Sequence, residues 1–593
     1  MAALFTTPRR NDTTAGTHVA EPDVRRRIGL AHGSWRRVTR RIVAGAVCAL
    51  TVSSLLMPSV SLAAEWVKVG GNKYNTAASD EAGTWSWDGA DDLKLNNYNG
   101  GEIQAAGKLN VNYSGTNIVT AEWIESIKVS HGTNENAELN IQGDEGGTLS
   151  VTSTEDAILS TGNINIDGAG SVNATSTGFD AINAGGDLAI KGSGNVNATG
   201  ASDGIRANGN ITIDDSGAVT ARATKDKGIG ADKNLTIKGG GTVEASSADG
   251  EALWSGGNIN ISDGSQVKAS SEKDAAVEAK GSLAVTNASL DASGVEYGVY
   301  AYKGVTLDHA TVMVRTSANG GQAIALITDG DDIVIKNGST VDAFAEGEVS
   351  AAFSTRNDRP NEKGGHIYIS DSVVKAIARY VENGDGPIPY SENQDGETRR
   401  EPQGENIGII AQTSEGVTPA VISIIRSKVT AEGDTAAIFA RAMSADGKTI
   451  GTIKIENAAI QMPEGGKVID YRKLRDGIYE AGQAIGTGHA TVDSLYIKAV
   501  AKSTTIAPPE VAKPEDPKPD ETKPAESKPA ESKQNPKPEG SKPTKAVAAS
   551  TTKAKTTGVL AATGDTSGAA IVATVLAGTA AIAAGTMASR KRS

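Results

Sequence analysis

Six aspartates recur at nearly equal steps through the middle of this chain, and their spacing suggests chemistry. The step is about 23–24 residues, a length that one unit of a repeat protein can span. The six are Asp156, Asp180, Asp203, Asp226, Asp249 and Asp274. If they stack one turn apart, their carboxylates repel one another and need a compensating group. Calcium, which takes oxygen ligands, would supply it. The alternative is that each aspartate caps its own turn and stays solvated.

A second candidate site is aromatic. Trp254, Glu278 and Tyr300 each follow an apolar position of the repeat, so we expect them to point outward on neighbouring turns. Trp254 and Tyr300 would then lie two turns apart, roughly 9.6 Å at the spacing of hydrogen-bonded strands. This distance is close to the length of a disaccharide in an extended polymer, so the three residues form a candidate carbohydrate site. The alternative is an isolated tryptophan beside a tyrosine-rich segment.

The sequence offers no convincing catalytic set. Arg206 lies near Asp203, an arrangement that would suit a polysaccharide lyase, but one arginine in a repeat is a weak basis for an activity. The histidines after residue 64 are scattered and have no metal-ligand spacing. We therefore predict that the chain is not an enzyme and name no catalytic residue.

Three apolar columns with the same step must position these side chains. The first column consists of Ile158, Ile182, Ile205, Ile229, Leu253, Val277, Val299 and Ile324. The second contains alternating pairs such as Leu188 and Ile190, and the third contains valines such as Val196, each followed by an inward alanine. Period-two alternation between Gly, Asn and Asp turns predicts three short strands per repeat.

Such strands can bury their apolar faces only by stacking repeat upon repeat. The predicted fold is therefore all-β, a right-handed parallel β-helix with about 23–24 residues per turn. A leucine-rich-repeat horseshoe is the rival, and its leucine frame is absent. Asn163, Asn210, Asn234 and Asn258, with Asp187 in step, precede the second strand and predict a structural amide ladder. Residues 84–101, with Trp85 and Trp87 on one strand face, are expected to cover the N-terminal end.

The N-terminus is typical of an export signal. An arginine-rich segment ending at Arg41 precedes a largely apolar stretch, and small residues at Ala63 and Ala64 provide a cleavage site. We assign residues 1–64 to this signal and favour the general secretory route over the twin-arginine route. An uncleaved N-terminal membrane anchor is the alternative.

The C-terminus combines a short motif, an apolar stretch and a basic tail. The motif is Leu560, Ala561, Ala562, Thr563 and Gly564. Residues 569–588 are apolar and long enough to span a bilayer as a helix, and the cations that follow would stay in the cytoplasm. This order resembles a sortase sorting signal of Gram-positive bacteria, in the Leu-Ala-x-Thr-Gly variant of actinobacteria. The resemblance implies transient membrane insertion, cleavage after Thr563 by sortase, and covalent attachment to peptidoglycan. A plain tail anchor is the alternative.

Composition divides the chain into successive segments. We expect a cap and first turns at 65–148, regular turns at 149–345, and irregular turns with long loops and a C-terminal cap at 346–505. Residues 506–559 are rich in Pro, Lys and Glu, which cannot bury enough apolar surface to fold, so they predict a disordered, wall-spanning stalk. Residues 560–593 form the sorting signal.

Charge and repeat pattern together indicate a function. The chain has a net charge of −13, and the part between its basic ends is more acidic still, which argues against nucleic acid as a partner. The recurring Asp-Gly-Ile-x-Ala-x-Gly-x-Ile-x-Ile pattern resembles bacterial carbohydrate-binding β-helix domains, which share their fold with pectate lyases. That resemblance implies binding of calcium and of acidic or cellulosic polysaccharide. We expect an extracellular, wall-anchored adhesin. A display protein without a glycan ligand is the main alternative, and a pectin lyase is the third.

Overall fold

The computed structural model describes residues 63–509, except for 134–136, 319–320, 358–364, 382–390, 393–397, 400–404, 415, 446, 476–477 and 489–498. The regular elements of these residues are all β-strands. The described part of the chain therefore contains no helix that could cross a membrane. Nearly all of the expected leader, the stalk beyond residue 509, the sorting signal and much of the two long loops lie outside the described residues.

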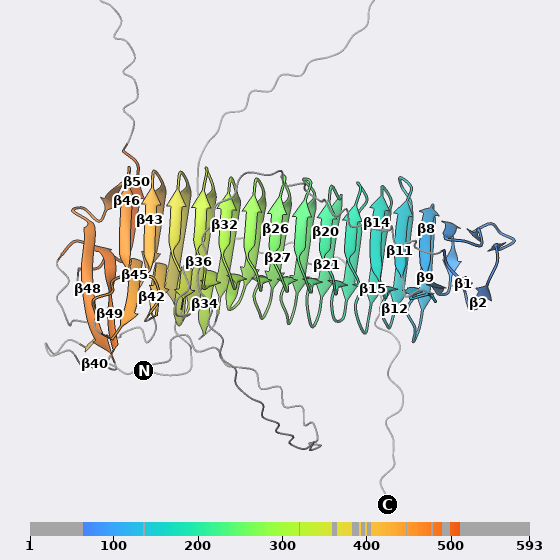
Figure 1. The fold of residues 1–593 in the computed structure, drawn as a ribbon, viewed down its shortest axis with the longest axis horizontal. Helices are drawn as coiled ribbons and strands as arrows, with labels where there is room; N and C mark the ends of the chain where they lie inside the picture. The colour runs from blue at the N-terminus through green and yellow to red at the C-terminus, as the bar shows by residue number, and fades with distance from the viewer. Residues whose placement is uncertain are drawn as a thin grey trace, which may run out of the picture. The chain divides into compact units, whose positions relative to one another are not determined.

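The described strands form three long sheets that run side by side (Figure 1). Sheet 1 has as its parallel members β7 (Ile103–Ala106), β10 (Ile127–Ser130), β13 (Ile158–Ser160), β16 (Ile182–Ala184), β19 (Ile205–Ala207), β22 (Ile229–Ala231), β25 (Leu253–Ser255), β28 (Val277–Ala279), β31 (Tyr297–Ala301), β34 (Gln322–Asp329), β37 (Val349–Asn357), β42 (Asn406–Thr413) and β45 (Ala436–Ser444).

Sheet 2 has as its parallel members β5 (Asp92–Asn96), β8 (Lys108–Ser114), β11 (Glu138–Gly143), β14 (Asn163–Gly168), β17 (Leu188–Lys191), β20 (Ile211–Asp214), β23 (Leu235–Lys238), β26 (Ile259–Ser262), β29 (Leu283–Thr286), β32 (Val305–Asp308), β35 (Ile333–Lys336), β38 (Ile367–Ser370), β43 (Val421–Ile425) and β46 (Thr452–Glu456).

Sheet 3 has as its parallel members β6 (Asn99–Gly100), β9 (Thr116–Ala121), β12 (Thr148–Ser153), β15 (Ser171–Ser176), β18 (Val196–Gly200), β21 (Ala218–Ala223), β24 (Thr242–Ser247), β27 (Gln266–Ser271), β30 (Ser289–Gly294), β33 (Thr311–Ser317), β36 (Thr340–Gly347), β39 (Val373–Tyr380) and β44 (Lys428–Gly433).

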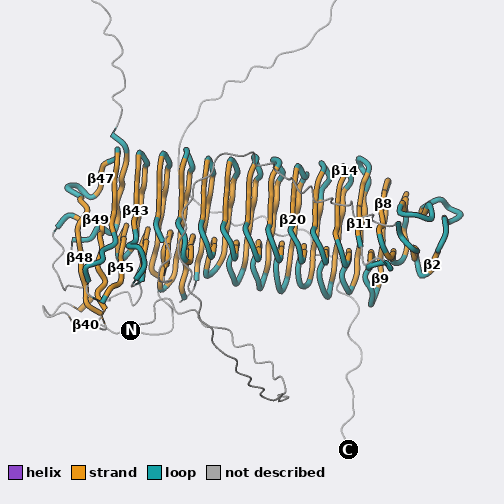
Figure 2. Tube along the Cα trace, in the orientation of Figure 1, coloured by secondary structure: helices purple, strands orange, loops and turns teal. Residues whose placement is uncertain are grey.

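The chain visits the three sheets in turn, so each circuit adds one strand to each sheet (Figure 2). β13, β14 and β15 make one circuit, and β16, β17 and β18 make the next. Successive circuits pair in parallel and in register, with Ile182 opposite Ile158 and Ile205 opposite Ile182. This is the arrangement of a parallel β-helix, and it confirms the all-β repeat fold that the three columns predict.

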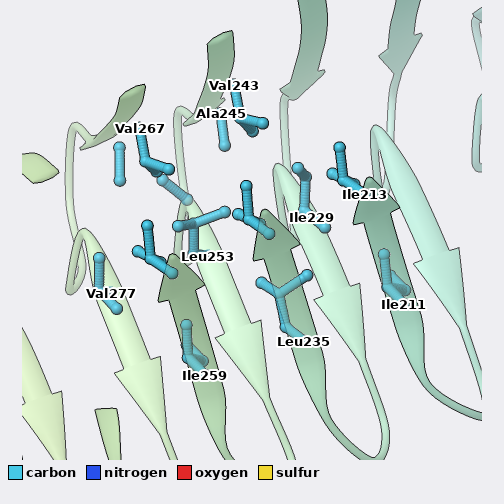
Figure 3. Close-up of a cluster of buried hydrophobic side chains, with 14 of the residues drawn as sticks. Ile211, Ile213, Ile229, Leu235, Val243, Ala245, Leu253, Ile259, Val267 and Val277 are labelled. Carbon is cyan, nitrogen blue, oxygen red and sulfur yellow. The ribbon is translucent and has the colours of Figure 1, made fainter. Parts of the chain in front are cut away.

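The core is a narrow interior lined by all three sheets (Figure 3). Leu253 comes from sheet 1, Leu235 from sheet 2 and Val243 from sheet 3, and all three side chains are fully buried. Ala245, two positions after Val243, is also buried and leaves room for the larger side chains. Stacking thus gives each aliphatic column a continuous dry interior, which a single circuit could not provide.

One member of the first column is placed wrongly by the sequence. The strand residue opposite Val299 is Leu326, whereas Ile324 lies opposite Tyr297. The register skips one residue in each strand, because Gly298 and Ala325 are not paired between these positions. Ile324 is therefore buried in a second apolar cluster outside the main core. From this circuit onward the strands of sheet 1 are longer, and equivalent residues are no longer separated by a constant 23–24 residues.

The amide ladder is confirmed on sheet 2. The main-chain N–H of Asn234 donates to Asn210 Oδ1 at 3.2 Å, and that of Asn258 donates to Asn234 Oδ1 at 2.9 Å. Asn234 Nδ2 also donates to Asn210 Oδ1 at 3.1 Å. Asp187 fits the same series, since its Oδ1 accepts the N–H of Asn210 at 2.7 Å. Each side chain thus satisfies a main-chain donor of the next circuit.

Antiparallel strands cover both ends of the described β-helix. The additional strands are β1 (Trp66–Val69), β2 (Asn72–Tyr74), β3 (Ala78–Ser79) and β4 (Trp85–Trp87) at one end, and β47 (Ala459–Met462), β48 (Lys467–Arg475), β49 (Ile478–Gly486) and β50 (Ser503–Ala507) at the other. Trp85 and Trp87 are buried, as expected of a cover. β50 pairs with β44 and β47 and reaches Ala507, so residues 506 and 507, expected to begin the stalk, belong to this strand. A short pair, β40 (Ser391–Glu392) and β41 (Thr398–Arg399), lies in the second loop.

The amide ladder makes a stability prediction. We expect Asn234→Ala to lower the free energy of unfolding by about 1–2 kcal/mol, because the N–H of Asn258 loses its acceptor. Asn234→Asp keeps an acceptor oxygen and should lose less. Thr236→Ala, two positions along the same outer face, is the matched control. Urea unfolding of the four proteins is the measurement, and equal midpoints would contradict a stabilising ladder.

Candidate functional site

The first three aspartates, Asp156, Asp180 and Asp203, form a ladder at the start of the sheet 1 strands. We call this series the acidic ladder. The N–H of Asp180 donates to Asp156 Oδ1 at 3.0 Å, and the N–H of Asp203 donates to Asp180 Oδ1 at 2.9 Å. The N–H of Lys227 continues the series to Asp203 Oδ1 at 2.5 Å. The geometry repeats that of the amide ladder, so these aspartates do cap main-chain donors of the following circuit.

The second oxygen of each carboxylate faces polar side chains on the outside of sheet 1. Asn183 Nδ2 donates to Asp156 Oδ2 at 3.1 Å and to Asp180 Oδ2 at 3.0 Å. Arg206 Nη1 lies 3.5 Å from Asp203 Oδ2, and its Nη2 lies 3.0 Å from Asp232 Oδ1. The charge that the aspartates place between circuits is thus partly compensated by their own neighbours.

Burial dominates the electrostatics of the acidic ladder. Asp203 is 1% exposed, and desolvation raises the pKa of its carboxyl to about 6 despite the hydrogen bond from Lys227. Burial likewise raises the pKa of Asp156 to about 6 and raises the pKa of Asp180. Neighbouring carboxylates add to these shifts. The ladder therefore binds protons more readily than isolated aspartates do.

The other three aspartates do not continue the ladder. The residues in register with Asp203 on the next two circuits are Lys227 and Glu251. Asp226 and Asp274 precede the ladder position by one residue, and Asp249 precedes it by two. Asp226 is the third residue of its five-residue corner, 224–228, whereas Asp180 is the fourth residue of a corner of the same length, 177–181.

The expected stack of six carboxylates is therefore wrong as geometry. Asp249 is exposed and pairs with Lys273 Nζ at 2.5 Å. Asp226 contacts Lys227 Nζ. Burial lowers the pKa of this lysine, but the contact with Asp226 and other nearby acids outweigh burial, so its pKa is raised. Calcium between the first three circuits stays a prediction.

Only one group of carboxylates in the described residues brings three ligand oxygens within 4.8 Å of one another. It consists of Asp88, Asp91 and Asp92, in the N-terminal cover. Asp88 Oδ1 there accepts the N–H of Ala90 at 2.8 Å and that of Asp92 at 3.1 Å. These bonds explain the cluster as a turn.

The aromatic candidates lie where the sequence predicts, on three neighbouring circuits of sheet 1. Trp254 is opposite Glu278, and Glu278 is opposite Tyr300. Only Trp254 remains partly accessible, because Glu278 and Tyr300 are each 8% exposed. Lys227 Nζ lies 5.3 Å from the Trp254 ring centroid, within the range of a cation–π contact. The three residues therefore do not form an open platform with two aromatic faces.

Tyr300 instead belongs to a second apolar cluster on the outer face of sheet 1. Its ring lies 4.5 Å from that of Tyr302, and its hydroxyl is 3.3 Å from Asp329 Oδ2. The buried members of the cluster are Ala275, Tyr297, Tyr300, Ile324, Ile327, Ala351, Ile407, Ile410, Ala436, Phe439, Ile469, Tyr471 and Ala484. The outer face of sheet 1 thus changes from polar and charged to apolar along the β-helix.

Two acids lie where these regions meet. Glu251 and Glu278 are on adjacent circuits, and burial together with the neighbouring Glu278 carboxyl raises the pKa of Glu251. Lys280 contacts Glu278, and its Nζ lies 4.1 Å from the Tyr302 ring centroid. This boundary packs acids, a lysine and tyrosines closely together, with Trp254 at its accessible edge.

A shallow hollow of about 520 Å³ lies elsewhere, on the outer face of sheet 2. Its lining includes Asp187, Ala189, Asn210, Thr212, Asn234 and Thr236. The amides of this lining bond to one another and to the main chain, as described above. The hollow is therefore lined by short side chains, and its amides already have partners, in keeping with a solvated face.

Sequence reasoning missed two exposed aromatic residues. Trp123 is 80% exposed and Phe179 is 51% exposed. Both lie in corners between sheet 3 and sheet 1, close to the acidic ladder. Neither belongs to an apolar column, and the only available signal was an aromatic residue in a turn that otherwise contains small and polar residues.

No protein-family model, curated protein or solved structure matches this chain. The carbohydrate-binding resemblance, the sortase signal and the absence of enzyme activity therefore stay predictions from the sequence.

The acidic ladder predicts a pH dependence of stability. Below the ordinary aspartate pKa, folded and unfolded chains both hold the protons, and the full stability is present. Above it, the unfolded chain ionises first, so stability falls as the pH rises toward the folded pKa of about 6 for Asp156 and Asp203, and it falls no further once both states are ionised.

We expect Asp156→Asn combined with Asp203→Asn to raise the melting temperature by a few degrees at pH 7.5 and to change it little at pH 3, where the aspartates are protonated in both states. Asn keeps the acceptor oxygen of each ladder bond while removing the buried charge. Asp249→Asn, off the ladder and exposed, is the control. Calorimetry in calcium-free buffer is the measurement, and equal shifts at both pH values would contradict the assignment.

Proposed function

We propose that this chain is an exported surface protein, anchored to the cell wall by sortase, whose β-helix binds an extracellular polysaccharide. It acts as an adhesin and performs no catalysis. In this proposal the β-helix is right-handed and residues 508–559 form a stalk through the wall. Residues 569–588 cross the membrane as a helix until Thr563 is transferred to peptidoglycan.

The observation that carries the binding function is the partly accessible side chain of Trp254 on the outer face of sheet 1. Its neighbours are Lys227, Glu251 and Glu278, on the same or adjacent circuits. An indole face surrounded by charged hydrogen-bonding groups suits a sugar ring, whose faces are apolar and whose rim carries hydroxyls.

The anchoring part of the proposal rests on the order of motif, apolar stretch and basic tail. The side chain of Ala64 is buried in the core of the β-helix, so the folded part of the chain begins at about this residue. This supports an export signal that ends close by. Cleavage after Ala63 would keep this contact in the mature chain.

The second candidate function is display without a ligand. The closed amide ladder and the covered ends favour it, because a rigid rod on a stalk can hold a surface away from the cell without binding anything. Binding to sugars separates the two functions.

We expect the purified full chain to be retained on at least one immobilised extracellular polysaccharide, and Trp254→Ala to weaken that retention at least ten-fold. Tyr368→Ala is the matched control, since Tyr368 is an exposed aromatic residue on sheet 2. Affinity chromatography over a panel of neutral, basic and acidic polysaccharides is the measurement. Retention on none of them would favour the display function.

Calcium at the acidic ladder makes a separate prediction. We expect calorimetric titration of the full chain with calcium to give heat that disappears in the variant combining Asp156→Asn with Asp180→Asn. Asp249→Asn should keep the heat. Heat that survives in the ladder variant and is lost in Asp88→Asn would place the ion in the N-terminal cover. No heat at millimolar calcium would leave the aspartates as turn caps.

A further inference from the structure

Two corners of the β-helix present aromatic rings to solvent, and we call the pair the aromatic corner (Trp123 and Phe179). Trp123 lies between β9 and β10, and Phe179 lies between β15 and β16. β9 and β15 both pair with β12, so the two corners are two circuits apart, roughly 9.6 Å. No other aromatic side chain among the described residues is as exposed as these two.

The main chain holds both residues in place. Trp123 has φ = +65°, a left-handed conformation that bulky residues rarely adopt. Its N–H donates to Thr154 Oγ1 at 2.8 Å, and Thr154 belongs to the corner between the two aromatic residues. The N–H of Phe179 donates to Ser176 Oγ at 2.9 Å. A fixed backbone that turns a large apolar ring into water is unfavourable for folding alone and points to a binding role.

The surroundings of the aromatic corner are acidic. Glu122 precedes Trp123 in its corner, and Glu155 lies in the corner of the circuit between the two rings. Asp156 and Asp180 of the acidic ladder lie at the adjacent strand starts. Glu125 is the one acid here with a cation, Lys128, at 2.8 Å. The carboxylates disfavour an anionic ligand and can accept hydrogen bonds from hydroxyl and ammonium groups.

We propose that the aromatic corner binds an extended polymer of hexopyranose sugars without acidic groups, with highest affinity when the sugars carry free amino groups. Trp123 and Phe179 stack on two sugar rings that lie one disaccharide length apart. The carboxylates between them, chiefly Glu155, bind the hydroxyl or ammonium groups. This inference rests on the proposed function and deepens it by naming the sugar class and a second contact region.

Two other occupants fit these observations less well. An anionic membrane would be repelled by the acids. A protein partner would need a continuous apolar patch, whereas Thr154 and Glu155 separate the two rings.

The test uses the purified full chain with three soluble probes: a β-1,4-linked glucosamine oligosaccharide, its fully N-acetylated counterpart, and polygalacturonate. We expect the glucosamine oligomer to bind most tightly, the N-acetylated oligomer more weakly, and polygalacturonate not at all. Trp123→Ala and Phe179→Ala should each weaken binding of the glucosamine oligomer at least ten-fold, as measured by calorimetry. Glu155→Gln should lower affinity for the glucosamine oligomer more than for the N-acetylated one.

Tyr368→Ala is the control for loss of an exposed ring, and circular dichroism confirms that each variant keeps its strands. One outcome would overturn the aromatic corner and keep the proposed function: Trp254→Ala abolishes sugar binding, whereas Trp123→Ala and Phe179→Ala leave sugar binding unchanged. Tightest binding to polygalacturonate would overturn the sugar class. Binding of none of the probes, or binding of phosphatidylserine vesicles in their place, would overturn the inference. Failure on the wider polysaccharide panel as well would remove the proposed function too.

Discussion

In-register parallel pairing is the constraint on which the rest of this structure depends. Each residue meets the equivalent residue of the circuits before and after it, so a side chain that suits one circuit must tolerate near copies of itself on both sides. Aliphatic side chains do so readily, which explains the continuous columns of isoleucine, leucine and valine. Polar side chains do so only if they can both donate and accept, or if other groups compensate their charge.

The two ladders show this difference. Asn234 and its equivalents accept through Oδ1 and donate through Nδ2, so they form a neutral, self-sufficient series. The acidic ladder uses the same bond to the next N–H but has no donor of its own. It depends on Asn183 and Arg206, and it is buried enough to favour protonation. Placing carboxylates where amides would serve costs stability at neutral pH, which is why the outer face of sheet 1 is the face we associate with binding.

The fold could be predicted because its signal is redundant: three columns carry the same step through many circuits. The sites could not be predicted equally well, because they depend on single residues in the corners. Asp226 stands one residue earlier in its corner than the ladder requires, so Lys227 takes the ladder position. The skipped register at Gly298 moves Ile324 out of the core. The exposure of Trp123 depends on a left-handed backbone conformation that no periodicity records. Strand spacing was readable from the sequence, whereas corner geometry was not.

The strands that cover the ends also affect how many copies can share one surface. A stack of nearly identical parallel circuits could in principle continue from one molecule into the next, as identical strands do in fibrils. Here sheet 1 ends on each side in an antiparallel pair, β1 with β2 and β49 with β48, instead of another parallel circuit. A neighbouring copy therefore meets a hairpin at either end of sheet 1, where continued stacking would need the strand of a further circuit. A crowded layer of these molecules would remain a population of separate rods rather than polymerise end to end.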